Sequence, residues 1–266
     1  MQHIHCQIAD TRKQIDDALR IRYTVFAEEC DYLDPTRRLV PREVDPFDTL
    51  DTTYNIVAYV DGNAVGTVRM HLPNAEVANA MGSQFGFDIE SRFDITKLGA
   101  MDMRLAETMR YSVLTKYRRT HVASALHAAV VQASRNAGIT HWIGCANTET
   151  DSLDDAALIH SIGQRSGLVH DQIHIEPREH ADYAHETRHP FFTTAERHAA
   201  HTNASPPRFP RILSIYTQRM GARLIGPPIY DTRFRMYSIP VLMAVDMQRV
   251  HPAHLQNTVE IPSLAA

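Results

Sequence analysis

The sequence predicts a mixed α/β fold in which a central mixed β-sheet is flanked by helices. Apolar runs at 54–59 and 64–72 are separated by Asp61-Gly62, a dipeptide typical of two-residue turns, and this pattern indicates a β-hairpin. An alanine-rich segment at 122–136 predicts a helix that Gly138 would end. Strand-like and helix-like patterns thus alternate along the chain, which favours a sheet covered by helices.

The remaining elements follow in chain order. Residues 10–26 carry apolar residues near helical spacing, with Thr11 as the expected cap, so they predict the first helix. Residues 29–42 contain prolines and charges without a period and predict a long loop. Residues 73–104 predict a short helix within irregular chain. The other expected elements are strands at 105–114, 140–146, 223–225 and 237–245, and helices at 153–164 and 212–220.

Length and composition set the class of protein. A chain of 266 residues with 44% apolar and 22% charged residues is typical of a globular protein, and we expect a single domain over 1–266 with a His- and charge-rich insertion at about 148–207. We expect the insertion to contain one helix, at 153–164. A net charge of −4 gives no general nucleic-acid signature.

The apolar runs and the N-terminal residues predict in which cellular compartment the protein is found. The longest runs fall far short of the roughly 20 apolar residues that span a bilayer, so we expect no membrane span. The first ten residues lack the basic and apolar regions of a signal peptide, which predicts a cytoplasmic protein. Cys6, Cys30 and Cys145 are widely spaced and suit reduced thiols.

Four short motifs in the first 110 residues concentrate charge. Unpaired buried charges cost several kcal/mol or more, so charged residues spaced among strands and helix ends favour an organised site over a plain core. The motifs are Arg22-x-x-Val25-Phe26, Glu43-x-Asp45-x-x-Asp48, Gly66-x-x-Arg69 and Glu107-x-x-Arg110.

The four motifs, in this order, resemble the signature of acyl-homoserine-lactone synthases and of their relatives, the N-acyl amino acid synthases, both of the GNAT acyltransferase fold. The order of predicted elements is similar to that fold, with the long insertion before the last helix. Residues 66–73 and 117–119 lean toward the N-acyl amino acid synthases. The resemblance covers about 10–147 and, more loosely, 208–246.

This resemblance implies an N-acyltransferase that moves a medium or long fatty acyl group from an acyl carrier protein to the α-amine of an amino acid. Glu107, grouped with Glu43 and Arg110, is the expected catalytic residue, because a buried carboxylate could accept the ammonium proton. The alternative is a plain ion pair between Glu107 and Arg110.

The resemblance further implies a charged network at the acceptor pocket. The alternative is a network that only organises the fold. The expected network residues are Arg22, Phe26, Asp45, Asp48 and Arg69, and the two aspartates could also meet the acceptor's ammonium.

For the donor, the resemblance implies a bulged strand near Ser112 and Val113 whose backbone N–H polarises the thioester carbonyl. His121 replaces the glycine with which GNAT acetyltransferases approach a pyrophosphate, and this favours acyl carrier protein over CoA as co-substrate, with no permanently bound cofactor. The alternative is a turn whose arginines are merely solvated. The donor loop comprises Arg118, Arg119, Thr120, His121, Val122 and Ala123.

Several questions stay open from the sequence. Tyr216 lies one residue from the position where many relatives carry a tyrosine that protonates the leaving thiolate, and Thr217 occupies that position. The histidines of the insertion lack metal-site spacing, so we expect no metal. Other functions are an autoinducer synthase using S-adenosylmethionine, an acetyl-CoA enzyme and a non-catalytic GNAT-like protein-binding module. Acyl length, acceptor and a homodimeric state are not predicted.

Overall fold

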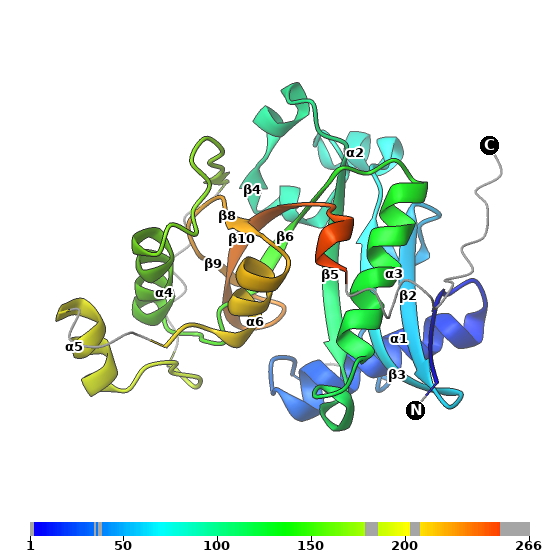
Figure 1. The fold of residues 1–266 in the computed structure, drawn as a ribbon, viewed down its shortest axis with the longest axis horizontal. Helices are drawn as coiled ribbons and strands as arrows, with labels where there is room; N and C mark the ends of the chain where they lie inside the picture. Colours follow the sequence, from blue (N-terminus) through cyan, green and yellow to red (C-terminus); the bar gives the residue numbers. More distant parts are fainter. Residues whose placement is uncertain (1–2, 35, 37–38, 179–185, 203–207, 251–266) are drawn as a thin grey trace. The chain divides into compact units, whose positions relative to one another are not determined.

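The structure, a computed structural model, describes residues 3–34, 36, 39–178, 186–202 and 208–250. It confirms the mixed α/β class, with strands in sheets and helices packed on them (Figure 1). Two compact units make up the chain: the first contains 1–74, 104–142 and 245–266, and the second contains 75–103 and 143–244. The single domain over 1–266 stays a prediction.

Four antiparallel strands form the sheet of the first unit, in the order β1-β2-β3-β5. The predicted hairpin is confirmed, because Asp61 (φ 49°) and Gly62 (φ 79°) both adopt the left-handed conformation that a two-residue type I′ turn requires. Strand β1 was not expected, although its apolar residues alternate. The strand bounds are β1 Ile4–Ile8, β2 Thr53–Val60, β3 Asn63–His71 and β5 Leu105–Val113.

Helices α1 (Arg12–Tyr23) and α3 (Val122–Asn136) cover opposite faces of this sheet. Val57 of β2 packs into an apolar cluster with α1 and is in register with Thr67. The adjacent Gly66 faces α3, since a Cβ there would lie 3.0 Å from side chains of that helix. Neighbouring strand residues point to opposite faces, so the two helices sandwich the sheet. Figure 1 shows α3 in front of this sheet, running roughly along its strands.

Local capping explains where α1 begins. The Thr11 side chain accepts a hydrogen bond from the Gln14 backbone, and the Gln14 side chain accepts one from the Thr11 backbone at 3.0 Å. Thr11 is thus the cap, as expected, and the two residues form a capping box. The helix continues as a π-helical turn, Thr24–Glu29. The loop that follows returns to α1, where the Glu43 N–H donates to the Leu19 carbonyl at 3.1 Å.

The second unit contains the remaining strands and four helices. Strand β10 lies between β6 and β8 and also pairs with β9, and β4 pairs with β7. The strand bounds are β4 Phe93–Asp94, β6 His141–Asn147 (in this unit from Ile143 onward), β7 Glu176–Pro177, β8 Arg223–Leu224, β9 Ile229–Asp231 and β10 Met236–Ala244. The helix bounds are α2 Ala75–Met81, α4 Leu153–Arg165, α5 Thr194–Thr202 and α6 Arg211–Ser214.

In the part of the predicted insertion that the structure describes, there are two α-helices instead of one. Helix α4 is the expected helix, whereas α5 was not predicted. A capping box explains α5, because the Thr193 N–H donates to the Glu196 carboxylate at 2.8 Å and the Glu196 N–H donates to Thr193 Oγ1 at 3.2 Å. This Thr-x-x-Glu spacing is visible in the sequence.

Among the described residues, no group of three or more His, Cys, Asp or Glu side chains could hold a metal ion. His170 accepts hydrogen bonds from the backbone of Gln172 and Ile173, and His174 lies 3.3 Å from Glu176. His180 and His185 lie outside the described residues. Within the same described part of the chain, no helix has the length and apolar character needed to cross a membrane.

Candidate functional site

The site begins as a row of polar residues across three strands of the first unit. Asn55, Arg69 and Met109 are directly in register on β2, β3 and β5, so their side chains share one face of the sheet. This is the α1 face, because Arg22 of α1 donates to Asn55 Oδ1 at 3.4 Å. Arg69 in turn donates to Met109 Sδ at 2.7 Å.

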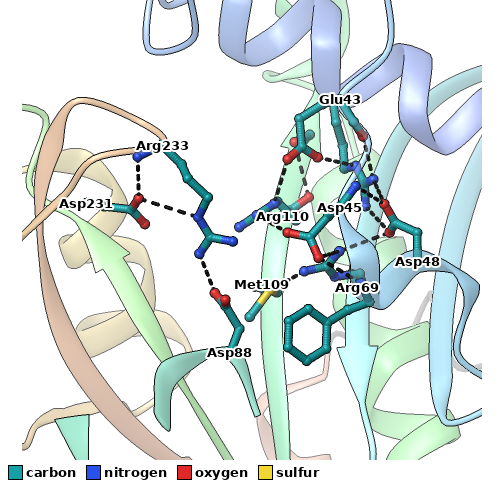
Figure 2. A network of polar contacts seen from close by, with 12 residues as sticks. Glu43, Asp45, Asp48, Arg69, Asp88, Met109, Arg110, Asp231 and Arg233 are labelled. Carbon is teal, nitrogen blue, oxygen red and sulfur yellow. Dashed lines mark hydrogen bonds and ion pairs between the residues drawn. The ribbon is translucent and has the colours of Figure 1, made fainter. Parts of the chain in front are cut away.

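Six buried charged residues close a ring on this face, which we call the charge ring (Figure 2). Each arginine bridges two carboxylates, and each carboxylate bridges two arginines, so the ring carries no net charge. All six are at most 8% exposed. In ring order the members are Arg22, Asp48, Arg69, Asp45, Arg110 and Glu43.

The acidic motif folds locally in a way that presents its carboxylates to the ring. Asp45 caps a short 3₁₀ turn, Pro46–Thr49, and Pro46 suits its first position. The Phe47 N–H donates to Asp45 Oδ1 at 3.0 Å, and the Asp45 N–H donates to Asp48 Oδ2 at 2.9 Å. The turn therefore fixes both aspartates relative to each other through its own hydrogen bonds, independently of the arginines.

Arginine contacts determine the charge state of Asp48. Burial by itself would raise the pKa of Asp48, but hydrogen bonds and charges from Arg22 and Arg69 outweigh it and lower the pKa to about 2. Asp48 is thus ionised at neutral pH. Arg69 lies between two carboxylates, at 3.2 Å from Asp45 and 2.9 Å from Asp48.

A β-bulge in β5 brings Arg110 into the ring. Arg69 pairs with Met109 and Thr67 with Ser112, so Val68 alone faces two residues, Arg110 and Tyr111. Arg110 has a φ of 58°. The predicted bulge thus lies directly before Ser112, which with Val113 has returned to regular pairing.

Glu107, the predicted base, lies on the same strand face two residues before Met109. It is fully buried and in register with His71 of β3. His71 hydrogen-bonds Thr53 through Nδ1 at 2.7 Å and packs against Phe47, with ring centroids 4.9 Å apart. A buried glutamate thus lies three residues before Arg110, the ring member on β5.

Phe26, the apolar member of the first motif, packs against the cluster formed by α1 and Val57. Its carbonyl accepts hydrogen bonds from Tyr32 at 2.7 Å and Leu33 at 3.1 Å. It thus supports the start of the loop that leads to the acidic motif.

The donor loop leads from β5 into α3. Arg118 donates to the Val113 carbonyl at 2.9 Å and forms an ion pair with Glu29, whereas Arg119 is exposed. Thr120 accepts from the Val122 N–H at 3.3 Å, and His121 is the exposed N-cap residue of α3. The Ala123 carbonyl accepts a hydrogen bond from the Tyr111 hydroxyl, which ties the bulge to α3.

In the second unit, Tyr216 and Thr217 lie in a π-helical turn, Ile215–Arg219, just before Gly221. The Thr217 hydroxyl donates to the Leu213 carbonyl at 2.8 Å. Burial raises the pKa of Tyr216 to about 12, so its hydroxyl keeps its proton at neutral pH.

A second charged cluster belongs to the second unit (Figure 2). Arg92 donates to Asp231 at 2.7 Å and to Asp88 at 3.2 Å, and Arg233 contacts the same two aspartates. Burial tends to lower the pKa of Arg233, but the charges of Asp88 and Asp231 raise it. The cluster joins the segment after α2 to β9 and was not predicted.

Comparison with known proteins relates the part of the chain that carries the motifs to a known family. Residues 21–128, which include all four motifs, match the family model described as an acetyltransferase (GNAT) domain. This part of the chain is a GNAT acyltransferase domain. The resemblance drawn from the motifs is thus confirmed, and the GNAT domain includes β2, β3, β5 and the start of α3. No curated protein matches the sequence.

Three solved structures are similar to this chain at low sequence identity, and FeeM shares its fold. FeeM, an N-acyl amino acid synthase from uncultured soil microbes, is 10% identical with a TM-score of 0.51, covering 92% of each chain. BjaI, a CoA-dependent acyl-homoserine lactone synthase, is 16% identical with a TM-score of 0.49, covering 99% of this chain and 92% of that one. An acyl-CoA N-acyltransferase from Pseudomonas aeruginosa is 14% identical with a TM-score of 0.48, covering 92% and 100%.

Sequence reasoning missed several residues of the site. Asn55, Met109 and His71 all contact members of the ring or their neighbours. The signal for Asn55 is its place as the only polar residue in the apolar run 54–59. Met109 has no such signal, because a methionine in a strand is usually a plain core residue.

Proposed function

We propose that this GNAT N-acyltransferase moves a medium or long fatty acyl group from an acyl carrier protein to the α-amine of an amino acid. The observation that carries the proposal is the charge ring, because the charged residues of all four motifs of the resemblance meet on one face of β3 and β5. The fully buried Glu107 lies beside it. The fold that the chain shares with FeeM supports the same branch.

In the proposed reaction Glu107 accepts a proton from the acceptor's ammonium, directly or through water, so that the amine can attack the thioester carbonyl. A backbone N–H at the bulge of Arg110 and Tyr111 stabilises the developing oxyanion. The nitrogen of the tetrahedral intermediate then loses its second proton to water, the intermediate collapses, the C–S bond breaks, and the leaving thiolate takes up a proton.

Mass spectrometry of lipid extracts from a bacterial host tests the proposal. The host expressing the intact protein should accumulate N-acyl amino acids, and the host expressing Glu107→Gln should not. Glu28→Gln, an equivalent change at an exposed glutamate, is the matched control and should leave product levels unchanged. Acyl-homoserine lactones in place of N-acyl amino acids would assign the autoinducer branch. Activity retained in Glu107→Gln would contradict the role of this base.

The carrier-protein donor rests on the loop before α3. Arg119 and Lys116 are exposed there, and acyl carrier proteins are acidic, so charge complementarity favours docking. Arg119→Glu should raise the KM for acyl carrier protein several-fold and leave the KM for acyl-CoA unchanged. Arg135→Glu reverses an exposed charge at the far end of the same helix and is the control. An equal loss with both donors would contradict a carrier-specific role.

A further inference from the structure

Arg110 has an unusual backbone conformation for a strand residue. Of the non-glycine residues with positive φ in the described part of the chain, it is the one that lies within a strand. Its φ of 58° places it in the left-handed region, which a residue with a Cβ adopts at a cost. Such a conformation persists only where the surrounding structure holds it.

The charge ring stabilises this backbone conformation through the side chain of Arg110. Arg110 donates from Nε to Glu43 at 3.2 Å and from Nη2 to Asp45 at 2.9 Å. Both carboxylates are in turn fixed by the two other arginines of the ring, Arg22 at 2.7 Å from Glu43 and Arg69 at 3.2 Å from Asp45. The anchors of Arg110 are therefore buried, charged and already held in place.

These anchors are within reach because of the bulge. Met109 faces α1, so regular alternation would turn Arg110 toward α3, away from Glu43 and Asp45. The bulge turns the Arg110 side chain to the α1 face, where charge-assisted hydrogen bonds to Glu43 and Asp45 stabilise it. The ion pairs and the left-handed backbone thus depend on each other.

We propose that Arg110 is a positioning residue, held in the left-handed conformation by the charge ring, and that it thereby sets the bulge of β5 for acyl transfer. The second part rests on the proposed function, in which a backbone N–H of this bulge meets the thioester carbonyl. The loop 43–48 would then act on catalysis through the backbone of β5, without its carboxylates touching the substrate.

Two variants at one position separate this role from a role of the guanidinium charge. Arg110→Gly and Arg110→Ala both remove the charge, but only glycine adopts a φ near 58° without strain. Each is made together with Asp45→Asn, so that the ring stays neutral. The glycine variant should have a kcat about tenfold above that of the alanine variant, with equal KM for the donor. Equal loss in both variants would overturn the proposal, because it would point to the charge itself.

Thermal unfolding provides a readout that is independent of the enzyme assay. At position 110 the glycine variant should have the higher Tm. At Thr108, a buried residue in the regular part of β5, Thr108→Gly should have a lower Tm than Thr108→Ala, since glycine weakens a regular strand. If the difference in Tm between the glycine and alanine variants has the same sign at positions 110 and 108, the proposal that the ring stabilises a left-handed Arg110 is wrong. If the signs are opposite but the protein transfers no acyl group, this part of the proposal stands and the proposed function is rejected.

Discussion

Arg22 and Asp48 share two parallel hydrogen bonds in the interior of the first unit, from Nη1 to Oδ1 at 2.8 Å and from Nη2 to Oδ2 at 2.5 Å. The two residues are 26 positions apart, so the pair joins helix α1 to the turn that carries the acidic motif. Bidentate pairs of this kind fix orientation as well as distance. The charge ring thus holds a loop, a helix and two strands in one arrangement.

Removal of one partner should therefore be costly. We expect Asp48→Ala to lower the free energy of unfolding by about 3–5 kcal/mol, because it leaves the buried Arg22 without its bidentate partner. Urea unfolding followed by circular dichroism measures the change. Lys13→Ala is the control, since Lys13 pairs with Asp17 at 2.7 Å but its side chain is 79% exposed, and it should cost less than about 1 kcal/mol. Similar losses in both variants would contradict a special contribution of the ring.

The same carboxylate should make stability depend on acid pH. The pKa of Asp48 is about 2 in the folded protein and 3.8 as its ordinary value, so the unfolded state binds its proton first as pH falls. Its contribution is present above about pH 4 and is lost as pH falls toward 2. Urea unfolding at pH 5 and pH 3 should show a smaller pH effect in Asp48→Asn than in the intact protein. An unchanged difference between the two pH values would contradict the lowered pKa.

The motif spacing predicted which charged residues gather, because arginines and carboxylates placed among strands must pair if they are buried. It could not predict the ring itself. The order of contacts depends on the bulge at Arg110, which turns one side chain to the other face, and no local pattern around Met109-Arg110-Tyr111 indicates a bulge. The contacts with Glu43 and Asp45, 67 and 65 positions away, account for it.

Elements with local signals were predicted best. The hairpin at Asp61-Gly62 and the helix ended by Gly138 depend on left-handed glycines, and both are confirmed. Strand β1 and helix α5 carried local signals that we did not use, an alternation and a capping box. In the second cluster Arg92 pairs with Asp231, 139 positions away, and Arg233 pairs with Asp88, 145 positions away. No local sequence pattern could therefore predict these pairs.

His127 of α3 should give a second pH dependence, at mildly acid pH. Burial lowers its pKa from 6.5 to about 4, and its ring packs edge-on against Trp142 with centroids 5.7 Å apart. Between pH 6.5 and 4 the unfolded state binds the proton and the folded state does not, so stability falls with pH by up to about 3 kcal/mol. His127→Phe should flatten the profile of unfolding free energy between pH 7 and 4.5. His141→Phe, a change at a histidine whose Nδ1 lies 3.0 Å from the Thr140 hydroxyl, is the comparison. A profile unaltered by His127→Phe would contradict the neutral state of this ring.

Asp155 should hold the second half of the insertion in place. Its buried carboxylate accepts hydrogen bonds from the backbone of Phe191 at 2.8 Å and Phe192 at 3.2 Å, and it pairs with Arg197 of α5 at 2.8 Å. Asp155→Ala leaves these donors unsatisfied, which costs about 1–3 kcal/mol for each buried group.

The segment around Arg188 and Arg197 should then open locally and be cut by trypsin at least about tenfold faster, while the rest of the chain stays protected. Asp154→Ala changes the neighbouring exposed aspartate of the same helix turn and should leave the rate unchanged. If both variants are cut at the rate of the intact protein, Asp155 does not anchor the segment. If both are cut faster, the effect comes from loss of negative charge at the start of α4, where acidic residues stabilise the helix.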